Sequence, residues 1–171
     1  MIKFIGAFEE VSDLPRHPTI PEFAFVGRSN VGKSSLVNAL AGGRVARVSN
    51  TPGRTRTLNL FNLDDRMWIM DLPGYGFARA SKDEQKRWLR RLEEYLSARR
   101  ELKKLFILID SRVGMKDADN LIIDFCRAGT IPYQIVWTKC DKKDAMDGLA
   151  GGIITSAQKK IGINEVKRAM T

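Results

Sequence analysis

The eight residues from Gly27 to Ser34 limit the fold of this 171-residue chain more than any other feature. They match the pattern G-x-x-x-x-G-K-[ST], and they stand between the apolar run Phe23–Val26 and the helical pattern Lys33–Ala41. A strand before the motif and a helix after it are the context that such a loop requires. Successive backbone N–H groups then face a phosphate chain, and the positive end of the following helix adds to the attraction. The residues predicted to contact phosphates are Gly27, Arg28, Ser29, Asn30, Val31, Gly32, Lys33, Ser34 and Ser35.

We expect separate roles for two side chains of this loop. Lys33 is expected to reach the β- and γ-phosphates of a nucleotide as a point charge, which makes it a catalytic candidate. The Ser34 hydroxyl is expected to ligate Mg²⁺, a hard ion that prefers oxygen ligands. A chance glycine-rich turn before a helix is the alternative.

Short apolar runs alternate with helical patterns along the rest of the chain. In the long pattern Asp83–Arg100, Trp88, Leu92, Tyr95 and Leu96 make one apolar stripe, and Ser81 with Glu84 predicts a capping box at its start. This alternation predicts an α/β fold of the P-loop NTPase class, a mostly parallel sheet with helices on both faces, as a single domain over residues 1–171. The predicted strands are Phe23–Val26, Met67–Met70, Leu105–Ile109, Gln134–Trp137 and Ile153–Ile154, and the predicted helices are Lys33–Ala41, Asp83–Arg100, Asp119–Ala128 and Asn164–Met170. Arg47–Thr57, Gly74–Lys82 and Lys142–Gly152 are predicted as loops.

The turn Thr138-Lys139-Cys140-Asp141 follows the fourth apolar run and indicates which base is bound. It is expected at the carboxyl edge of the sheet, where ligands of doubly wound folds bind. A carboxylate at Asp141 would accept hydrogen bonds from N1–H and the 2-amino group of guanine, a pair of donors that adenine lacks. The Lys139 stem would cover the base, and the backbone of Ser156 and Ala157, after Thr155, would meet guanine O6. Alone, this turn is as well explained by a solvated surface loop, but its order after the phosphate loop strengthens the prediction.

A third motif, D-x-x-G, occupies Asp71, Leu72, Pro73 and Gly74. Asp71 is expected to hold Mg²⁺ through a water, and the Gly74 N–H is expected to meet the γ-phosphate; alone, the motif would read as an ordinary turn after a strand. The metal shell is completed by a threonine, with Thr55 preferred and Thr57 as the alternative. The remaining residues assigned to nucleotide contact in this loop are Gly53, Arg54 and Arg56.

Composition narrows the class of protein further. Lysine and arginine number 29 against 20 acidic residues, so the net charge is +9. Such a surplus fits a polyanionic partner and equally well fits plain solubility. Two cysteines and the single histidine, His17, argue against a disulfide framework, a histidine-rich metal site and a Ser-His-Asp triad. Neither a run of 18 apolar residues nor a secretory signal is found, so no membrane contact and a reducing cytoplasmic location are expected, with an organelle matrix as an alternative.

Together these motifs resemble a translation-factor-class GTPase and, more narrowly, the EngB family (also called YihA or YsxC). The resemblance covers most of the chain, from FAFVGRSNVGKSSLVNAL through NTPGRTRTLNLF, WIMDLPGYGFARAS and LFILIDSRVGMKDAD to YQIVWTKCDK and IITSAQKKIGINEVKRAM. It implies a switch that binds GTP and GDP with Mg²⁺ and helps to assemble the large ribosomal subunit. It also implies that ribosomal RNA or a subunit precursor is the partner of what we expect to be a monomer.

Two departures qualify this resemblance. Only 13 residues separate Asp141 from Thr155, where the family has a longer segment with a helix; either this chain lacks the helix or residues are absent from the sequence. Tyr75 follows the D-x-x-G glycine, where Ras-like enzymes carry the glutamine that orients water. The family shares this absence, and it predicts slow hydrolysis that a ribosomal partner or K⁺ accelerates. Asn30 is the candidate K⁺ ligand, and a purely structural role in the loop is an equal alternative.

Several basic residues are candidates for RNA contact. Arg44, Arg47, Arg54 and Arg56 surround the loop whose conformation would depend on the γ-phosphate. The long helix contributes Lys86, Arg87, Arg90, Arg91, Arg99 and Arg100, although a solvated helix face is the preferred interpretation there. The other functional classes that we consider are a nucleotide-gated scaffold with negligible turnover, a nucleotide kinase or ATPase, and a nucleic-acid-binding module indifferent to nucleotide.

Overall fold

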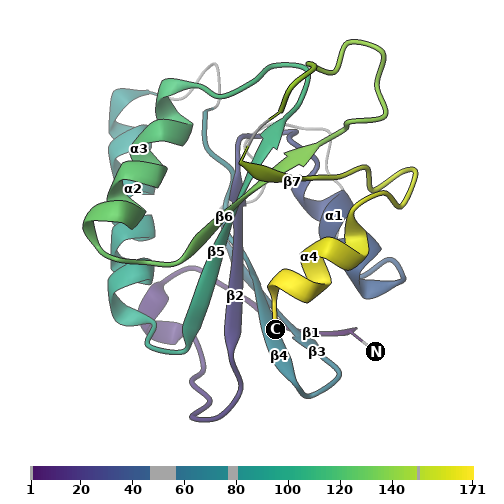
Figure 1. Ribbon diagram of the computed structural model, residues 1–171. Coiled ribbons are helices and arrows are strands. Elements are labelled where there is room, and N and C mark those ends of the chain that lie inside the picture. The colour runs from purple at the N-terminus through teal and green to yellow at the C-terminus, as the bar shows by residue number, and fades with distance from the viewer. Residues whose placement is uncertain (1, 47–56, 77–80, 150) are drawn as a thin grey trace.

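A seven-stranded sheet forms the centre of the computed structural model, which describes residues 2–46, 57–76, 81–149 and 151–171 (Figure 1). Across the sheet the strands follow the order β1-β3-β4-β2-β5-β6-β7. Their bounds are β1 Ile2–Phe8, β2 Glu22–Gly27, β3 Leu58–Leu63, β4 Met67–Asp71, β5 Leu102–Asp110, β6 Tyr133–Thr138 and β7 Gly152–Ile154. The five strands predicted from apolar runs are all present, as β2, β4, β5, β6 and β7.

The sheet is mixed because β3 runs against the other six strands. It pairs antiparallel with β1 on one side and with β4 on the other, whereas the four pairings from β4 to β7 are parallel. Strands β1 and β3 were not predicted. Lys3 interrupts the apolar residues of the edge strand β1, and its neighbours Phe4 and Ile5 are exposed, so β1 lacks the continuous buried apolar run of the central strands.

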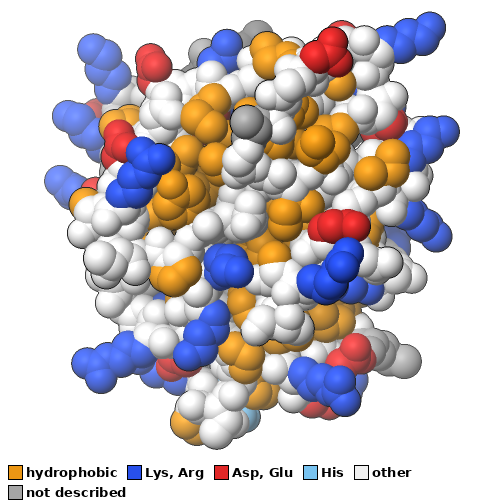
Figure 2. Space-filling view, viewed as in Figure 1, with side chains coloured by type: hydrophobic (Ala, Val, Ile, Leu, Met, Phe, Trp, Pro, Cys, Tyr) orange, Lys and Arg blue, Asp and Glu red, His pale blue; other side chains and the backbone are white. Residues whose placement is uncertain are grey.

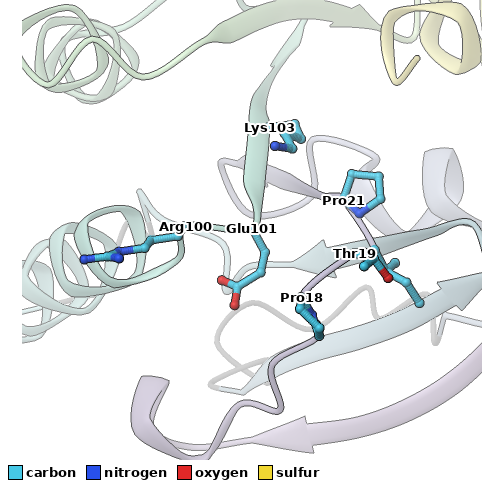
Figure 3. Close-up of a pocket in the computed structure, with 7 residues that line it drawn as sticks. Pro18, Thr19, Pro21, Arg100, Glu101 and Lys103 are labelled. Atoms are coloured by element: carbon cyan, nitrogen blue, oxygen red, sulfur yellow. The ribbon is translucent and has the colours of Figure 1, made fainter.

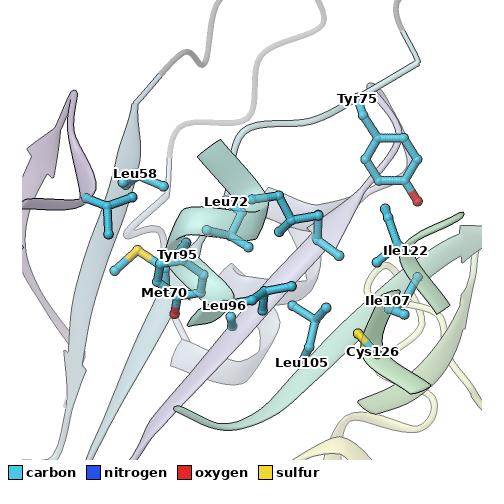
Figure 4. Close-up of a cluster of buried hydrophobic side chains, with 14 of the residues drawn as sticks. Leu58, Met70, Leu72, Tyr75, Tyr95, Leu96, Leu105, Ile107, Ile122 and Cys126 are labelled. Atoms are coloured by element: carbon cyan, nitrogen blue, oxygen red, sulfur yellow. The ribbon is translucent and has the colours of Figure 1, made fainter. Parts of the chain in front are cut away.

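Helices cover both faces of the sheet, as predicted (Figure 1). Their bounds are α1 Lys33–Ala41, α2 Lys82–Ala98, α3 Asp117–Ala128 and α4 Ile163–Ala169, and a short 3-10 turn, η1, spans Val11–Asp13. Apolar side chains of α1 and α4 pack in one core layer, and those of α2, α3 and η1 pack in the other. Figure 4 shows the second layer, where Tyr95 and Leu96 of α2 lie near Leu105 of β5 and where Ile122 and Cys126 of α3 continue the cluster.

Helix α2 follows its sequence pattern closely. Leu92, Tyr95 and Leu96 are buried, and Ser81 forms the predicted capping box, accepting from the Glu84 N–H while the Glu84 carboxylate accepts from the Ser81 N–H. The helix ends at Ala98 rather than Arg100. Among the described residues, no helix is both long and apolar enough to cross a membrane.

The parallel strands place the ends of several strands together. Strands β4, β2, β5 and β6 are neighbours running in one direction, so Asp71, Gly27, Asp110 and Thr138 end them at the same edge of the sheet. Strand β2 lies between β4 and β5. After β2 the chain first adds β3 and β4 on one side of it and then adds β5, β6 and β7 on the other. This change of side makes the ends of these strands a topological switch point, the place where ligands usually bind in such sheets.

Candidate nucleotide-binding site

The predicted phosphate loop connects β2 to α1 in the required geometry. Asn30 and Gly32 have φ angles of 62° and 102°, and the Val31 N–H donates to the Arg28 carbonyl at 3.1 Å, so the loop curls before the helix begins at Lys33. A Cβ atom at Gly27 would lie 2.7 Å from Val31 Cγ1. Glycine is therefore required at this position for the loop to close against the end of β2.

Lys33 lies in the first turn of α1 with its ammonium group directed across the edge of the sheet. It forms a buried ion pair with the Asp71 carboxylate at the end of β4. The first and third sequence motifs therefore meet. Asp71 and the Ser34 hydroxyl supply hard oxygen donors, the ligand type that Mg²⁺ takes from proteins when phosphates and water complete its shell.

The two threonines predicted as metal ligands differ in how far the structure describes them. Thr55 lies outside the described residues, as do Gly53, Arg54 and Arg56. Thr57 is described, and its hydroxyl donates to the Asn59 side-chain oxygen at 3.1 Å. Within the described part of the chain, no group of three or more His, Cys, Asp or Glu side chains forms a metal centre. Of the three preferred magnesium ligands, the structure therefore describes Ser34 and Asp71, and the prediction for Thr55 stays open.

The base-recognition turn is tied directly to the phosphate loop. The Thr138 hydroxyl donates to the Val31 carbonyl at 2.6 Å, and the Lys139 ammonium donates to the Asn30 carbonyl at 2.6 Å. The Lys139 backbone adopts a φ angle of 59°. Its side chain passes Gly32, where an added Cβ atom would lie 3.7 Å from Lys139 Cε. The second motif therefore joins the other two at one end of the sheet, with the Lys139 side chain against the phosphate loop.

Asp110, at the end of β5, is a site residue that the sequence analysis missed. Its carboxylate pairs with the Lys139 ammonium at 2.9 Å and accepts hydrogen bonds from the Arg112 guanidinium at 2.8 and 3.0 Å. Burial alone would raise the pKa of Asp110, but the bonds from Arg112 and Lys139 outweigh it and lower that pKa to about 2. The signal was available, because an aspartate directly follows the apolar run Leu105–Ile109 at the ligand edge.

Asp141 is held by the turn that follows β7. A hydrogen bond from the Ser156 hydroxyl, helped by the Lys142 ammonium, lowers the pKa of the Asp141 carboxyl, which keeps it an ionised acceptor. The Cys140 N–H donates to the Thr155 carbonyl at 3.1 Å and so fixes the two turns to each other. The Ser156 N–H donates to the Ile161 carbonyl at 3.0 Å, and the contact of Ser156 and Ala157 with guanine O6 stays a prediction.

The D-x-x-G segment leaves β4 beside the phosphate loop. The Leu72 N–H donates to the Phe25 carbonyl at 3.0 Å, and Trp88 of α2 donates its indole N–H to the Pro73 carbonyl at 2.8 Å. A Cβ atom on Gly74 would lie 3.4 Å from the Gly27 carbonyl oxygen. The glycine predicted to meet the γ-phosphate is thus packed against the phosphate loop.

The segment after Asp141 is short, as its sequence indicated. Residues 142–149 form turns without a helix before β7 begins. The Met146 N–H donates to the Ser111 carbonyl at 3.0 Å, so this segment is anchored to the loop that follows β5.

The basic surplus is divided among several surfaces. Figure 2 shows lysine and arginine side chains scattered over one face, both at its outline and across its middle. Arg99 was a candidate for RNA contact, but it is only 4% exposed, because its guanidinium pairs with the buried Glu22 carboxylate. Arg91 lies 3.7 Å from Glu10. The exposed basic residues of this set are Arg44, Lys86, Arg87, Arg90 and Arg100, and Arg47, Arg54 and Arg56 lie outside the described residues.

A hollow of about 470 Å³ lies at the opposite edge of the sheet (Figure 3). It is lined by Pro18–Pro21 before β2 and by Arg100, Glu101 and Lys103 near the start of β5. The Glu101 carboxylate lies 3.8 Å from Arg16 and 3.9 Å from Arg99, so arginines of this region face its charge. None of the predicted nucleotide contacts is among the residues that line it.

Comparison with known proteins decides the family. Residues 22–139 match the family model described as 50S ribosome-binding GTPase. The chain is 44% identical to the probable GTP-binding protein EngB of Aquifex aeolicus over 142 residues, which cover 82% of this chain and 76% of that protein. The chain belongs to the EngB family of GTP-binding proteins. It spans 64% to 66% of the length of other EngB relatives from Rhodospirillum, Thermotoga, Roseobacter and Rickettsia.

Solved structures agree with the EngB assignment at the level of the fold. The crystal structure of a probable GTP-binding protein engB superposes with a TM-score of 0.69 at 24% identity, covering 86% of this chain and 95% of that one. A variant of Era from Aquifex aeolicus, crystallised with bound GDP·AlF₄⁻, superposes with a TM-score of 0.67 at 25% identity, covering 89% of this chain and 56% of that one. The P-loop α/β architecture predicted from the sequence is confirmed.

Proposed function

We propose that this chain binds GTP and GDP with Mg²⁺, hydrolyses GTP slowly, and uses the difference between the two states as a switch in assembly of the large ribosomal subunit. One observation carries the proposal. Thr138 and Lys139, which precede the base-selecting Asp141, are hydrogen-bonded to the same loop that presents Lys33. A base at Asp141 and a phosphate chain at Lys33 can therefore belong to one ligand.

Guanine selection rests on Asp141. An ionised carboxylate accepts the N1–H and 2-amino hydrogen bonds of guanine, whereas adenine leaves it unpaired. The Ser156 bond that lowers the Asp141 pKa also orients the acceptor. Cys140 fills a position within this turn, with its thiol donating to the Trp137 carbonyl at 3.4 Å, and is not assigned a nucleophilic role.

Lys33, Ser34, Asp71 and Gly74 form the phosphate end of the site. Magnesium, when bound, would neutralise charge on the phosphate oxygens. On this proposal the Lys33 ammonium exchanges its Asp71 partner for phosphate oxygens, and the Gly74 N–H donates to the terminal phosphate. No side chain is assigned as a general base, so hydrolysis depends on positioning and electrostatic stabilisation and is expected to be slow.

We infer the partner and the location from family membership together with charge. The 50S ribosome-binding description of the family and the net charge of +9 both suit ribosomal RNA or a subunit precursor. We keep Arg44, Arg47, Arg54 and Arg56 as candidate contacts, and we expect a cytoplasmic monomer. Potassium stimulation through Asn30 stays a prediction from the sequence.

A second candidate function is a nucleotide-gated scaffold with negligible turnover. It is favoured by Tyr75, because its hydroxyl donates to the buried Asp119 carboxylate and is therefore turned away from any attacking water. Phosphate release from GTP separates the two candidates when it is measured with and without ribosomal subunits, in potassium and in sodium, with Lys33→Ala as the inactive control. Turnover that rises with subunits or potassium supports the GTPase. Nucleotide binding without turnover in every condition supports the scaffold.

A further inference from the structure

Tyr75 is bonded to the phosphate loop through its backbone. Its N–H donates to the Gly27 carbonyl at 3.3 Å, and its carbonyl accepts the Ser29 N–H at 2.9 Å, so the residue bridges the loop on both sides. The preceding Gly74 packs at the same place, where an added Cβ would lie 3.4 Å from Ser29 N. The position of the Gly74 amide is therefore set by how firmly Tyr75 is held.

The Tyr75 side chain is anchored in the core. The residue is 4% exposed, and its ring centroid lies 4.9 Å from that of Trp88 (Figure 4 shows Tyr75 at one end of the apolar cluster, near Ile122). Its hydroxyl donates to Asp119 Oδ1 at 2.5 Å. Burial, together with the Asp119 charge, raises the Tyr75 pKa far above its usual value, so the hydroxyl remains a donor at every physiological pH.

Asp119 connects this tyrosine to a second residue of the phosphate loop. The carboxylate is fully buried, and its Oδ2 accepts the Lys116 N–H at 2.8 Å where α3 begins. Arg28 of the phosphate loop places Nε 3.6 Å from Oδ2 and donates through Nη2 to the Gly114 carbonyl at 3.1 Å. Tyr75 and Asp119, which are buried, and Arg28, which is partly exposed, thus form one cluster that joins the phosphate loop, the D-x-x-G segment and α3; we refer to it as the Tyr75 cluster.

We propose that Tyr75 is a positioning residue for the γ-phosphate: its bond to Asp119 holds the Gly74 amide against the phosphate loop and so sets the preference for GTP over GDP. The inference rests on the proposed function, since only a triphosphate reaches Gly74. The hydroxyl does not replace the water-orienting glutamine of Ras-like enzymes. It acts instead through the backbone on the residue before it.

The test compares Tyr75→Phe with the wild-type chain by calorimetric titration of GDP and of a GTP analogue with an imido bridge between the β- and γ-phosphates. Removing the hydroxyl leaves Asp119 Oδ1 short of a partner, and the ratio of analogue affinity to GDP affinity is expected to fall roughly 5- to 30-fold, the range for one buried hydrogen bond. GDP affinity is expected to change by less than about twofold, because GDP has no γ-phosphate.

Tyr95→Phe is the matched control. Tyr95 is also buried and also donates to a buried carboxylate, Glu22, which pairs with Arg99, but this group lies at the opposite edge of the sheet. Both variants are expected to lower the thermal unfolding midpoint, and only Tyr75→Phe should change the affinity ratio. Asp119→Asn, which removes the charge that Tyr75 and Arg28 face, is expected to lower the same ratio and provides a second route if Tyr75→Phe does not fold.

The outcomes separate the two levels of the argument. A ratio that stays within about twofold of wild type, or equal losses for GDP and the analogue, overturns the role of Tyr75 while the proposed function stands. A wild-type chain that binds neither guanine nucleotide overturns the proposed function itself.

Discussion

Replacing Asp110 with asparagine tests whether the carboxylate at the end of β5 is held ionised by its two basic partners. The folded pKa is about 2 and the ordinary value is 3.8. A carboxylate whose pKa is lowered on folding stabilises the protein above the unfolded value, and that contribution is lost as the pH falls through the folded value. The shift corresponds to about 2 kcal/mol at pH 7 and to about half of that at pH 3.

Urea denaturation at pH 7, 5, 4 and 3 measures this contribution. The free energy of unfolding of Asp110→Asn should lie below that of wild type at pH 7, and the gap should narrow by about 1 kcal/mol between pH 7 and pH 3. Asp124→Asn is the matched control, since Asp124 is an exposed carboxylate on α3 that faces Arg127 at 3.6 Å; its gap to wild type should stay nearly constant. A gap for Asp110→Asn that is independent of pH, or that widens in acid, would refute the reasoning.

Three further substitutions test single features of the fold and site. Gly27→Ala places a methyl group 2.7 Å from Val31 Cγ1, so GDP affinity measured by calorimetry should fall at least roughly tenfold, and the free energy of unfolding should fall by about 1–3 kcal/mol. Gly43→Ala has open space around its Cβ and should leave GDP binding unchanged. Ser81→Ala removes the cap of α2 and should lower the free energy of unfolding, followed by circular dichroism, by about 1 kcal/mol; no change would show that the capping box is dispensable. Arg99→Met leaves the buried Glu22 carboxylate without its ion-pair partner, so the free energy of unfolding measured in urea should fall by about 3–5 kcal/mol. A decrease below about 1 kcal/mol would mean that water compensates that charge.

The sequence predicted the elements whose patterns are strong by themselves. Buried parallel strands read as continuous apolar runs, which is why β2, β4, β5 and β6 were recognised within two residues of most of their ends. The capping box of α2 was equally predictable, because the side chains of Ser81 and Glu84 each hydrogen-bond to the backbone N–H of the other residue within one turn. Local chemistry determines both kinds of feature.

Features that depend on distant partners were not predicted. Strands β1 and β3 are defined by pairing with each other, and the exposed side chains of β1 hide that role. Arg99 read as a surface charge because its partner Glu22 lies 77 positions away. The Tyr75–Asp119 bond likewise joins segments that no spacing rule connects. The motifs of the site were predicted in order. The Asp110–Lys139 ion pair and the bridge between Ser156 and Ile161 could be found only from the three-dimensional structure.

Calorimetric titration of GDP and ATP into wild type and Asp141→Ala tests the central claim most directly. The account predicts that wild type binds GDP and rejects ATP, and that Asp141→Ala loses roughly 1–3 kcal/mol of GDP affinity, the penalty for unmade buried hydrogen bonds, while leaving the weak ATP binding unchanged. Equal binding of ATP and GDP to wild type, or undiminished GDP affinity in Asp141→Ala, would contradict it.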